Sequence, residues 1–270
     1  MESIGTRKHQ VTPEPYYQDE AVTIYLGDSM SILPTLSNID GIVTDPPYSS
    51  GGAMRSDRTT ATITKYVQTG TQRESHDFHG DNRDQRSFLV WCTMWLAACY
   101  NVSNPNAVLA SFIDWRQLPT LSDAIQAGGW VWRGIAVWDK GFGRPMPGRF
   151  SGSSEYLLSG SKGAMTQTDE YPPGIFHSPT PKDRQHITQK PEAVMQWAMR
   201  IVKPGGMVLD PFMGSGTTIK MAKETGRKAI GIELDERFAE IAANRCAETF
   251  YIPPSETPEV EDQPSLFGLG

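Results

Sequence analysis

The last third of the sequence alternates between strand-like and helix-like segments, and this alternation limits the possible folds more than any other feature. Apolar stretches at 207–210 and 229–234 have the length of buried strands. A helix is expected between them at 217–225, ending at Gly226, and another after Asp235, a favourable N-terminal cap. Strands joined by helices form parallel sheets covered on both faces. The sequence therefore predicts an α/β domain that binds its ligands at the carboxyl ends of the strands.

The same pattern extends toward the N-terminus. Apolar segments predict further strands at 22–26, 39–44, 107–113, 131–138 and 154–159. Helices are expected from about residue 85 and over 115–127, where a pair of glycines would end the second one. The length of the chain is sufficient for one such domain with insertions.

The composition along the chain indicates where this domain begins and ends. Residues 1–20 are polar and are predicted to form an N-terminal arm, 21–250 the main domain, and 251–270, which are acidic, a disordered tail. Residues 49–84 lack apolar periodicity and are expected to be a mobile loop. Residues 160–188 are expected to be irregular.

A glycine-rich turn, DPFMGSGTT, follows the strand at 207–210. Gly214 and Gly216 allow the backbone to turn sharply and a ligand to approach closely. The lysine of a phosphate-binding loop is absent, so nucleotide phosphates are not the expected ligand. Glu233 ends the next strand, where a carboxylate can accept hydrogen bonds from ribose hydroxyls. A structural turn followed by a solvated acid is the alternative, but the two features together favour a cofactor site.

The sequence Asp45-Pro46-Pro47-Tyr48 follows the strand at 39–44 and cannot continue it, because proline has no N–H to donate within a sheet. Its rigid backbone presents a carboxylate, a free carbonyl and an aromatic ring together. Asp45 and the Pro46 carbonyl can each accept one hydrogen of an amino group, and Tyr48 can stack on a flat base. A kinked strand end with a surface tyrosine is the alternative.

These motifs resemble those of the site-specific DNA amino-methyltransferases. Residues 45–48 are similar to the family's catalytic D-P-P-Y motif, 210–218 to its F-x-G-x-G cofactor motif, and 188–191 (TQKP) to the segment that holds the cofactor's methionine end. Asp28 resembles the acid that meets the cofactor's adenine, and Glu233 the acid that binds its ribose. The resemblance implies a Rossmann-like, S-adenosylmethionine-dependent methyltransferase fold, circularly permuted, with a mostly parallel sheet and helices on both faces.

The order of the motifs is part of the resemblance. The catalytic motif precedes the cofactor motif, as in the circularly permuted β class, which implies a target-recognition segment at 139–188 and a homodimer. One departure is at His186, which proline commonly follows in the family. The implied site residues are, for catalysis, Asp45, Pro46, Pro47 and Tyr48 and, for S-adenosylmethionine, Asp28, Lys190, Asp210, Phe212, Gly214, Ser215, Gly216, Thr217, Thr218 and Glu233.

The function implied by the resemblance is methyl transfer from S-adenosylmethionine to the N6 amino group of an adenine flipped out of double-stranded DNA. Asp45 favours adenine, since serine is the more frequent family residue at that position for cytosine N4. Methylation of cytosine N4, methylation of a glutamine amide in a protein, and a catalytically silent DNA-binding module are the alternatives. The presence of both Asp45 and the glycine-rich turn argues against the silent module.

Net charge neither requires nor excludes a DNA partner. The chain carries −6, but acids concentrate in its last twenty residues, so a local basic face is compatible with the composition. Basic residues in 49–84 and 139–188 are candidates to contact phosphates or guanine edges, although interleaved acids leave a solvated surface as the alternative. The DNA-binding candidates are Arg55, Arg58, Lys65, Arg144, Arg149, Lys182 and Arg184.

The three cysteines, Cys92, Cys99 and Cys246, share no metal-ligand spacing. We therefore expect a reducing, cytoplasmic environment, a packing role for each thiol and no metal site. A nucleophilic cysteine is not evident, which disfavours methylation of a cytosine ring carbon. The longest apolar run, 88–100, is too short to span a bilayer and is expected to be a buried helix.

A short motif, QPSLF, lies near the end of the acidic tail. It resembles the Q-x-x-L-F peptide by which bacterial proteins bind the replication sliding clamp. Leu266 and Phe267 would fill an apolar pocket of the clamp, and Gln263 would hydrogen-bond at its rim. Folding of the two apolar side chains back onto the domain is the alternative.

Overall fold

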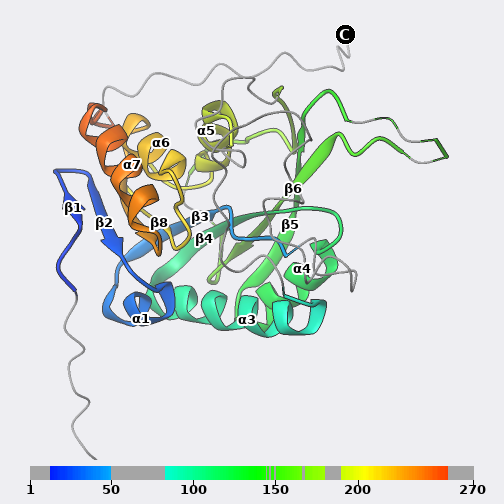
Figure 1. Cartoon of the computed structure of the whole chain (residues 1–270), viewed down its shortest axis with the longest axis horizontal. Helices are drawn as coiled ribbons and strands as arrows, with labels where there is room; N and C mark the ends of the chain where they lie inside the picture. The colour runs from blue at the N-terminus through cyan, green and yellow to red at the C-terminus, as the bar shows by residue number, and fades with distance from the viewer. Residues whose placement is uncertain are drawn as a thin grey trace, which may run out of the picture.

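The computed structural model describes residues 13–49, 83–143, 145, 147–148, 150–165, 168–179 and 190–254, and a nine-stranded sheet runs through them (Figure 1). The strand order is β1-β2-β9-β8-β3-β4-β6-β5-β7. The strands are β1 (Tyr17–Gln18), β2 (Val22–Leu26), β3 (Ile39–Thr44), β4 (Ser103–Ile113), β5 (Val131–Asp139), β6 (Ser154–Ser161), β7 (Ile175–His177), β8 (Met207–Asp210) and β9 (Lys228–Glu233).

Five adjacent strands, β2, β9, β8, β3 and β4, are parallel. Leu26 lies beside Glu233 at one side of this group, and Thr44 lies beside Ser111 at the other. Because parallel strands end at the same edge, the segments that follow them meet there. The sheet therefore brings the D-P-P-Y motif and the glycine-rich turn to one edge, as the sequence predicts.

Strand β6 is antiparallel to its neighbours β4 and β5. Tyr156 pairs with Ile113 at the end of β4, and Ser154 pairs with Asp139 at the end of β5. The amino end of β6 thus lies at the edge where the parallel strands end, and a residue at the start of β6 faces the segments that follow them.

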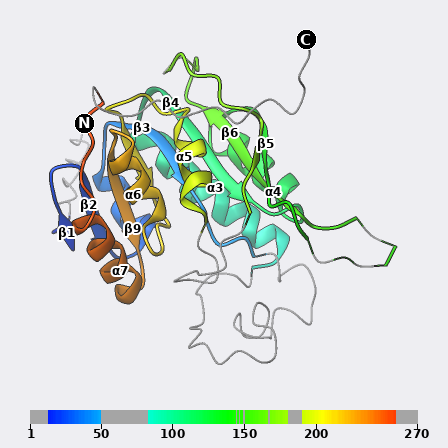
Figure 2. The ribbon, with the colours of Figure 1, turned by 90° about the horizontal axis from the view of Figure 1, so that it is seen from above.

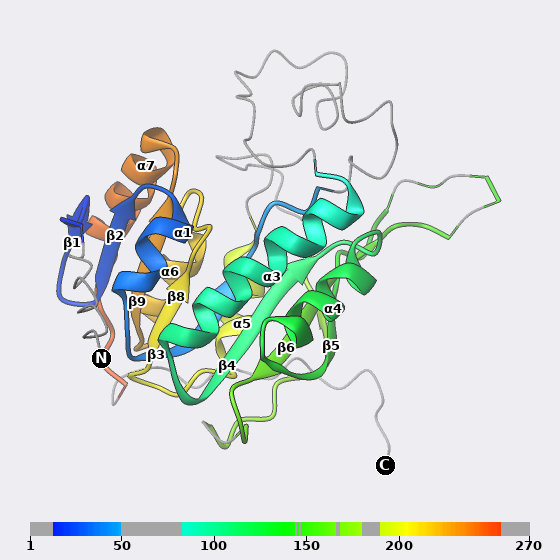
Figure 3. The same cartoon turned by 90° about the horizontal axis from the view of Figure 1, so that it is seen from below.

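Helices cover both faces of the sheet (Figures 2 and 3). One face carries α1 (Ser29–Ile32), the short 3₁₀ helix η1 (Leu33–Thr35), α3 (Gln85–Val102) and α4 (Leu118–Ala127). The other face carries α5 (Glu192–Met199), α6 (Thr217–Glu224) and α7 (Glu236–Ala247). Each face has its own hydrophobic core, in which buried aliphatic and aromatic side chains of the sheet pack against these helices.

The chain leaves β8 and β3 toward opposite faces. Strand β8 leads through the glycine-rich turn into α6, whereas the chain after β3 returns in α3 on the other face. Ligands of open α/β sheets bind where the connections that follow two neighbouring strands go to opposite faces, because a crevice forms between these connections. The β8–β3 boundary is therefore where the fold predicts the binding site.

Several elements differ from the sequence prediction, helix α4 and strand β7 among them. Helix α4 begins at Leu118, not at Trp115, because the Asp114 carboxylate accepts the backbone N–H groups of Arg116 and Gln117 and holds a turn there. Strand β7 lies in the segment expected to be irregular. It pairs with β5, and its His177 contacts the Asp139 carboxylate at 3.2 Å.

The ends of the described chain are attached to the domain. Strand β1, within the predicted N-terminal arm, pairs with β2, and Asp19 beside it forms an ion pair with Lys223 at 2.6 Å. The N–H of Ile252, within the predicted tail, donates to the Lys223 carbonyl at 3.3 Å. Residues 1–12 of the arm, 50–82 of the predicted loop and 255–270 of the tail, which include Gln263, Leu266 and Phe267, lie outside the described residues.

The interior of the domain agrees with the predictions made from its apolar residues. All three cysteines are buried, and the apolar run at 88–100 forms most of α3, whose N-terminus Asp84 caps. Among the parts of the chain that the structure describes, no helix combines the length and apolar character needed to cross a bilayer.

Candidate functional site

Asp45 lies directly after β3, and its two carboxylate oxygens have different hydrogen-bond donors. Tyr48 Oη donates to Oδ1 at 2.5 Å, and Lys190 Nζ donates to Oδ2 at 2.6 Å. Pro46 between them is buried, and Ser49 has a positive φ of 51°. The first and last residues of the D-P-P-Y motif are therefore hydrogen-bonded to each other, which holds its carboxylate and its aromatic ring together.

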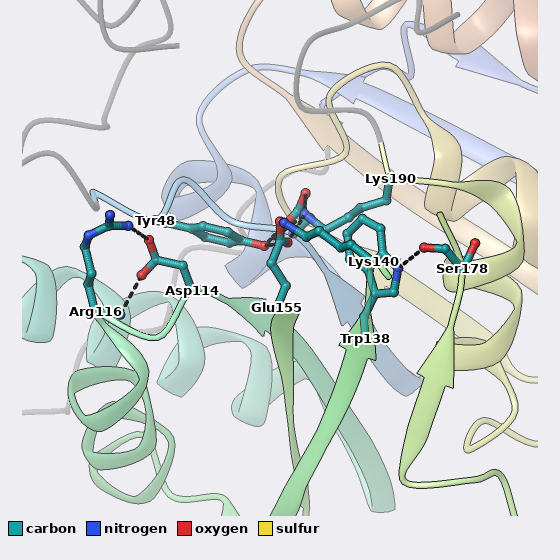
Figure 4. A network of polar contacts seen from close by, with 9 residues as sticks. Tyr48, Asp114, Arg116, Trp138, Lys140, Glu155, Ser178 and Lys190 are labelled. Atoms are coloured by element: carbon teal, nitrogen blue, oxygen red, sulfur yellow. Dashed lines mark hydrogen bonds and ion pairs between the residues drawn. The ribbon is translucent and has the colours of Figure 1, made fainter. Parts of the chain in front are cut away.

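Lys190 occupies the centre of this site. Its side chain is 7% exposed, and its ammonium contacts Tyr48 Oη at 2.9 Å and Glu155 Oε2 at 3.0 Å (Figure 4). The rings of Phe112 and Trp138 lie 5.2 and 5.9 Å from the nitrogen. The sequence assigned Lys190 to the cofactor, and that role stays a prediction. The structure places its ammonium at the D-P-P-Y motif.

Glu155, the second residue of β6, is a site residue that the sequence analysis missed. Its carboxylate accepts from Tyr48 Oη at 3.1 Å and from Lys140 Nζ at 2.5 Å, in addition to its ion pair with Lys190. The residue reaches the site because β6 is antiparallel, so that its first residues lie beside the ends of the parallel strands. An acid at the start of an otherwise uncharged strand was the available signal.

The charges of this cluster depend on one another. Burial raises the pKa of Asp45, against the attraction of Lys190. Burial also opposes ionisation of Glu155, but Lys190 and Lys140 outweigh it and lower the pKa of Glu155 to about 2. Burial would lower the pKa of Lys190, but Asp45 and Glu155 raise it. Lys190 is therefore an ammonium ion at neutral pH, shared between two carboxylates.

The two glycines of the glycine-rich turn have different surroundings. Both have positive φ, 52° for Gly214 and 80° for Gly216. A Cβ on Gly216 would lie 2.6 Å from the Cβ of Ala242 in α7, so this glycine is needed for helix packing. A Cβ on Gly214 would meet nothing within 4 Å. Open space for a ligand thus lies beside Gly214.

Two carboxylates stand at the adjoining strand ends. Glu233 accepts the N–H groups of Gly214, Leu234 and Asp235, each at 2.9 Å, and thereby joins the turn to the start of α7. Burial raises the pKa of Glu233, although these hydrogen bonds oppose the shift. Asp28 is exposed and caps α1, and the N–H of Gly27 donates to the Glu233 carbonyl. The structure therefore brings together the two acids that the sequence assigned to the cofactor.

Asp210 lies beneath the turn, where it is 1% exposed. Its Oδ1 accepts from Thr44 Oγ1 at 2.7 Å and from the N–H of Phe212 at 3.1 Å, and Thr218 also hydrogen-bonds to the carboxylate. Burial raises the pKa of Asp210 to about 6, against these hydrogen bonds. Because Thr44 ends β3, the Asp210 side chain joins the glycine-rich turn to the residue before the D-P-P-Y motif.

The remaining residues of the turn are also fixed by the domain. Arg245 of α7 donates to the Ser215 carbonyl at 2.7 Å and to Thr217 Oγ1 at 3.2 Å. The ring of Phe212 packs against Trp91 and Trp95 of α3, at centroid distances of 5.2 and 5.3 Å. The turn is thus attached to helices on both faces of the sheet.

The predicted DNA-binding residues are not among those the structure places. Arg55, Arg58, Lys65, Arg144, Arg149, Lys182 and Arg184 all lie outside the described residues. Two other lysines of the predicted recognition segment are described. Lys140 pairs with Glu155, and Lys162 donates to the carbonyls of Tyr100 and Ser103.

Known proteins resemble the chain over most of its length. It is 28% identical over 225 residues to YubD of Escherichia coli (strain K12), covering 82% of this chain and 88% of that protein. It is 27% identical over 264 residues to the type II methyltransferase M2.LlaDCHI of Lactococcus lactis subsp. cremoris, covering 86% and 91%.

Solved structures share the fold. The crystal structure of an M1.HpyAVI–SAM complex matches with a TM-score of 0.57 and 25% identity, covering 83% of this chain and 99% of that one. The PvuII DNA methyltransferase, described as cytosine-N4-specific, matches with a TM-score of 0.66 and 17% identity, covering 86% and 88%. The predicted α/β methyltransferase fold is thereby confirmed.

A family model described as DNA methylase matches residues 39–244, which include the strands and turns that form the site. The matched region spans most of the chain. The chain therefore belongs to the N6_N4_Mtase family of DNA methylases.

Proposed function

We propose that this protein transfers a methyl group from S-adenosylmethionine to the N6 amino group of adenine in double-stranded DNA. The observation that carries the proposal is the position of Asp45, which is held with Tyr48 beside the glycine-rich turn. The hydrogen bond between Thr44 and Asp210 joins the two segments. A base at the first segment and a methyl donor at the second would therefore be neighbours.

The chemistry of the glycine-rich turn fits S-adenosylmethionine. The open side of Gly214 leaves room for a ligand, and Asp28 and Glu233 offer carboxylate oxygens to the amino and hydroxyl groups of a nucleoside. The cofactor, when bound, supplies an electrophilic methyl group on a sulfonium sulfur. Ser215 and Thr217 contact Arg245, and Thr218 contacts Asp210; their predicted contacts with the cofactor stay a proposal.

Asp45 and the Pro46 carbonyl would each accept one hydrogen of the target amino group. These hydrogen bonds favour a pyramidal nitrogen and raise its electron density, so that it gains the methyl group in a single displacement and then releases one proton. Catalysis of this kind depends on position and electrostatics, without a covalent intermediate. The Tyr48 ring would stack on the base, which must leave the duplex to reach Asp45.

Adenine is favoured by Asp45 at the first position of the motif. The second candidate is cytosine N4, because the chain shares its fold with the cytosine-N4-specific PvuII enzyme and the chemistry at the amino group is the same. Methylation of a protein glutamine is a weaker candidate, since the family is one of DNA methylases.

Analysis of nucleosides separates these candidates. DNA from cells that express the chain, and from cells that express Asp45→Ala, is digested and measured by mass spectrometry. N6-methyladenine that depends on Asp45 supports the proposal. N4-methylcytosine that depends on Asp45 would show that the second candidate is right. If neither sample contains a methylated base, the proposed function is wrong. Single-molecule sequencing of the same DNA gives the recognition site.

Three further predictions from the sequence remain proposals. They are target recognition by 139–188 with the basic residues named above, a homodimer, and binding of the sliding clamp through Gln263, Leu266 and Phe267. A peptide of residues 258–270, titrated against purified clamp, tests the last of these, with Leu266 and Phe267 changed to alanine as the control.

A further inference from the structure

Glu155 and Lys140 belong to the polar network around Asp45, but the proposed mechanism gives them no task. The Glu155 side chain is 17% exposed and has ion pairs with Lys140 at 2.5 Å and with Lys190 at 3.0 Å. The sheet does not need these contacts, because β6 is already hydrogen-bonded to β4 and β5 on both sides. A half-buried acid with two ammonium partners beside a reactive carboxylate calls for a functional explanation.

The two carboxylates share the same donors. Lys190 Nζ lies 2.6 Å from Asp45 Oδ2 and 3.0 Å from Glu155 Oε2. Tyr48 Oη lies 2.5 Å from Asp45 Oδ1 and 3.1 Å from Glu155 Oε2. The Tyr48 hydroxyl has one hydrogen, so a hydrogen bond from it to Glu155 replaces the one to Asp45. An amino group that enters the site needs Asp45 as its acceptor, and an acceptor engaged with an ammonium ion is a weaker partner for it.

We propose that Glu155 is a positioning residue for methyl transfer, which accepts Lys190 and Tyr48 as an alternative to Asp45 and so frees the Asp45 carboxylate for the target amino group. Lys140 keeps Glu155 ionised and oriented, as its 2.5 Å contact indicates. The inference rests on the proposed function. It adds two residues to the site, Lys140 directly after β5 and Glu155 near the start of β6.

The titratable groups that face Asp45 come from the elements packed around it. They are Tyr48 of its own turn, Lys190 before α5, Glu155 of β6 and Asp210 of β8, and Lys140 acts through Glu155. With glutamine at position 155, Lys190 would direct its whole charge to Asp45. Because Glu155 contributes to raising the pKa of Asp45, the same change would lower that pKa.

Steady-state kinetics of the full chain test the proposal, with unmethylated DNA and S-adenosylmethionine carrying a tritiated methyl group. In Glu155→Gln we expect kcat to fall about 10- to 100-fold, as for loss of one charged hydrogen bond. The KM for S-adenosylmethionine should stay within about twofold. The acid limb of the pH profile of kcat/KM should move to lower pH, because Asp45 would ionise more readily.

Two further variants sharpen the result. Glu224→Gln makes the same chemical change on α6, where Glu224 pairs with Lys220 at 2.8 Å, and should leave kcat and the pH profile unchanged. Lys140→Gln should lower kcat in the wild-type background and have no further effect in Glu155→Gln, since Lys140 acts through Glu155.

Three results would overturn the inference: wild-type kcat in Glu155→Gln, a lower kcat with an unmoved acid limb, or a loss of activity that follows a loss of folded protein. A titration of the Asp45 carboxyl by carbon-13 NMR needs no activity. If the wild-type chain methylates no DNA, the proposed function fails, and the shift of the Asp45 pKa in Glu155→Gln still decides whether Glu155 acts on Asp45.

Discussion

Asp45 is held by partners from distant parts of the chain. Tyr48 belongs to its own turn, but Lys190 lies 145 residues later, before α5, and ties the two segments together. The consequence is an acid that is partly buried, fixed in orientation and still ionisable, because an ammonium ion opposes the effect of burial on its pKa. These are the properties required of an acceptor that must be in place before a base arrives.

Asp45→Asn tests this role with little change in shape. The amide keeps one acceptor oxygen but no charge, so we expect methyl transfer to fall at least about 100-fold, the usual effect of removing one preorganised electrostatic partner. Binding of S-adenosylmethionine, measured by calorimetry, should stay near the wild-type affinity, since Asp45 is assigned to the base. Near-normal activity would remove Asp45 from the catalytic site.

The two glycines of the turn should respond differently to the same substitution. Gly216→Ala places a Cβ within 2.6 Å of Ala242 at a φ of 80°, and we expect a loss of about 2–4 kcal/mol of unfolding free energy from overpacking and backbone strain. Gly214→Ala has the backbone strain alone, about 1 kcal/mol, but its methyl group would enter the space assigned to the cofactor.

Urea unfolding and calorimetry on both glycine variants separate these effects. Gly216→Ala should lose mainly stability, and Gly214→Ala mainly affinity for S-adenosylmethionine. Wild-type affinity in Gly214→Ala would mean that the cofactor does not occupy the space beside this residue.

At the scale of elements, the sequence predicts best the strands that are buried within the sheet. The predicted bounds of β2, β3 and β8 match the structure, because each is a short apolar run ended by a glycine, a proline or a polar turn. Strand β7 was missed, since three residues carry too little periodicity, and its pairing with β5 depends on contacts between distant segments.

The candidate site was predictable only in part, for a related reason. Asp45 and the glycine-rich turn belong to motifs of consecutive residues, so both can be predicted from the sequence. Glu155 and the ammonium of Lys190 reach Asp45 through the antiparallel pairing of β6 and the path of the chain into α5. Neither follows from local spacing, because only the completed sheet determines which strand ends meet.

Asp210 joins β8 to β3 and should make stability depend on pH. Its pKa is about 6 in the folded protein and ordinarily 3.8, so the folded state holds the proton more tightly than the unfolded state does. The Asp210 contribution to stability is therefore largest below about pH 4 and is lost as pH rises to about 6. In Asp210→Asn this loss is absent.

The measurement is the difference in unfolding free energy between Asp210→Asn and wild type, from urea titrations at pH 4, 5, 6 and 7. It should change in favour of the variant between pH 4 and 6, by up to about 3 kcal/mol, and then stay level. A constant difference would show that Asp210 is ionised throughout and that its hydrogen bonds to Thr44 and Phe212 outweigh burial.

At the scale of the whole molecule, the proposed site lies between the two hydrophobic cores. The glycine-rich turn leads into α6 on one face, but the ring of Phe212 within it packs against Trp91 and Trp95 on the other. Arg245 of α7 and the Thr44 side chain fasten the same turn from two more directions. A ligand in this turn would contact a segment to which both cores are attached, so its binding should be linked to global unfolding.

This linkage gives a prediction that needs no DNA. S-adenosylmethionine at about 100 times its dissociation constant should add about 2.7 kcal/mol to the stability of the folded state, which raises Tm by about 5–10 °C for a chain of this size. Asp45→Asn should show the same rise, because its side chain is assigned to the base and not to the cofactor. Gly214→Ala should show little or none at the same concentration, whatever its own Tm. Differential scanning fluorimetry on the three proteins checks these outcomes. A rise that is lost in Asp45→Asn and kept in Gly214→Ala would reverse the assignment of the two segments, since the methyl donor would then bind against the D-P-P-Y motif.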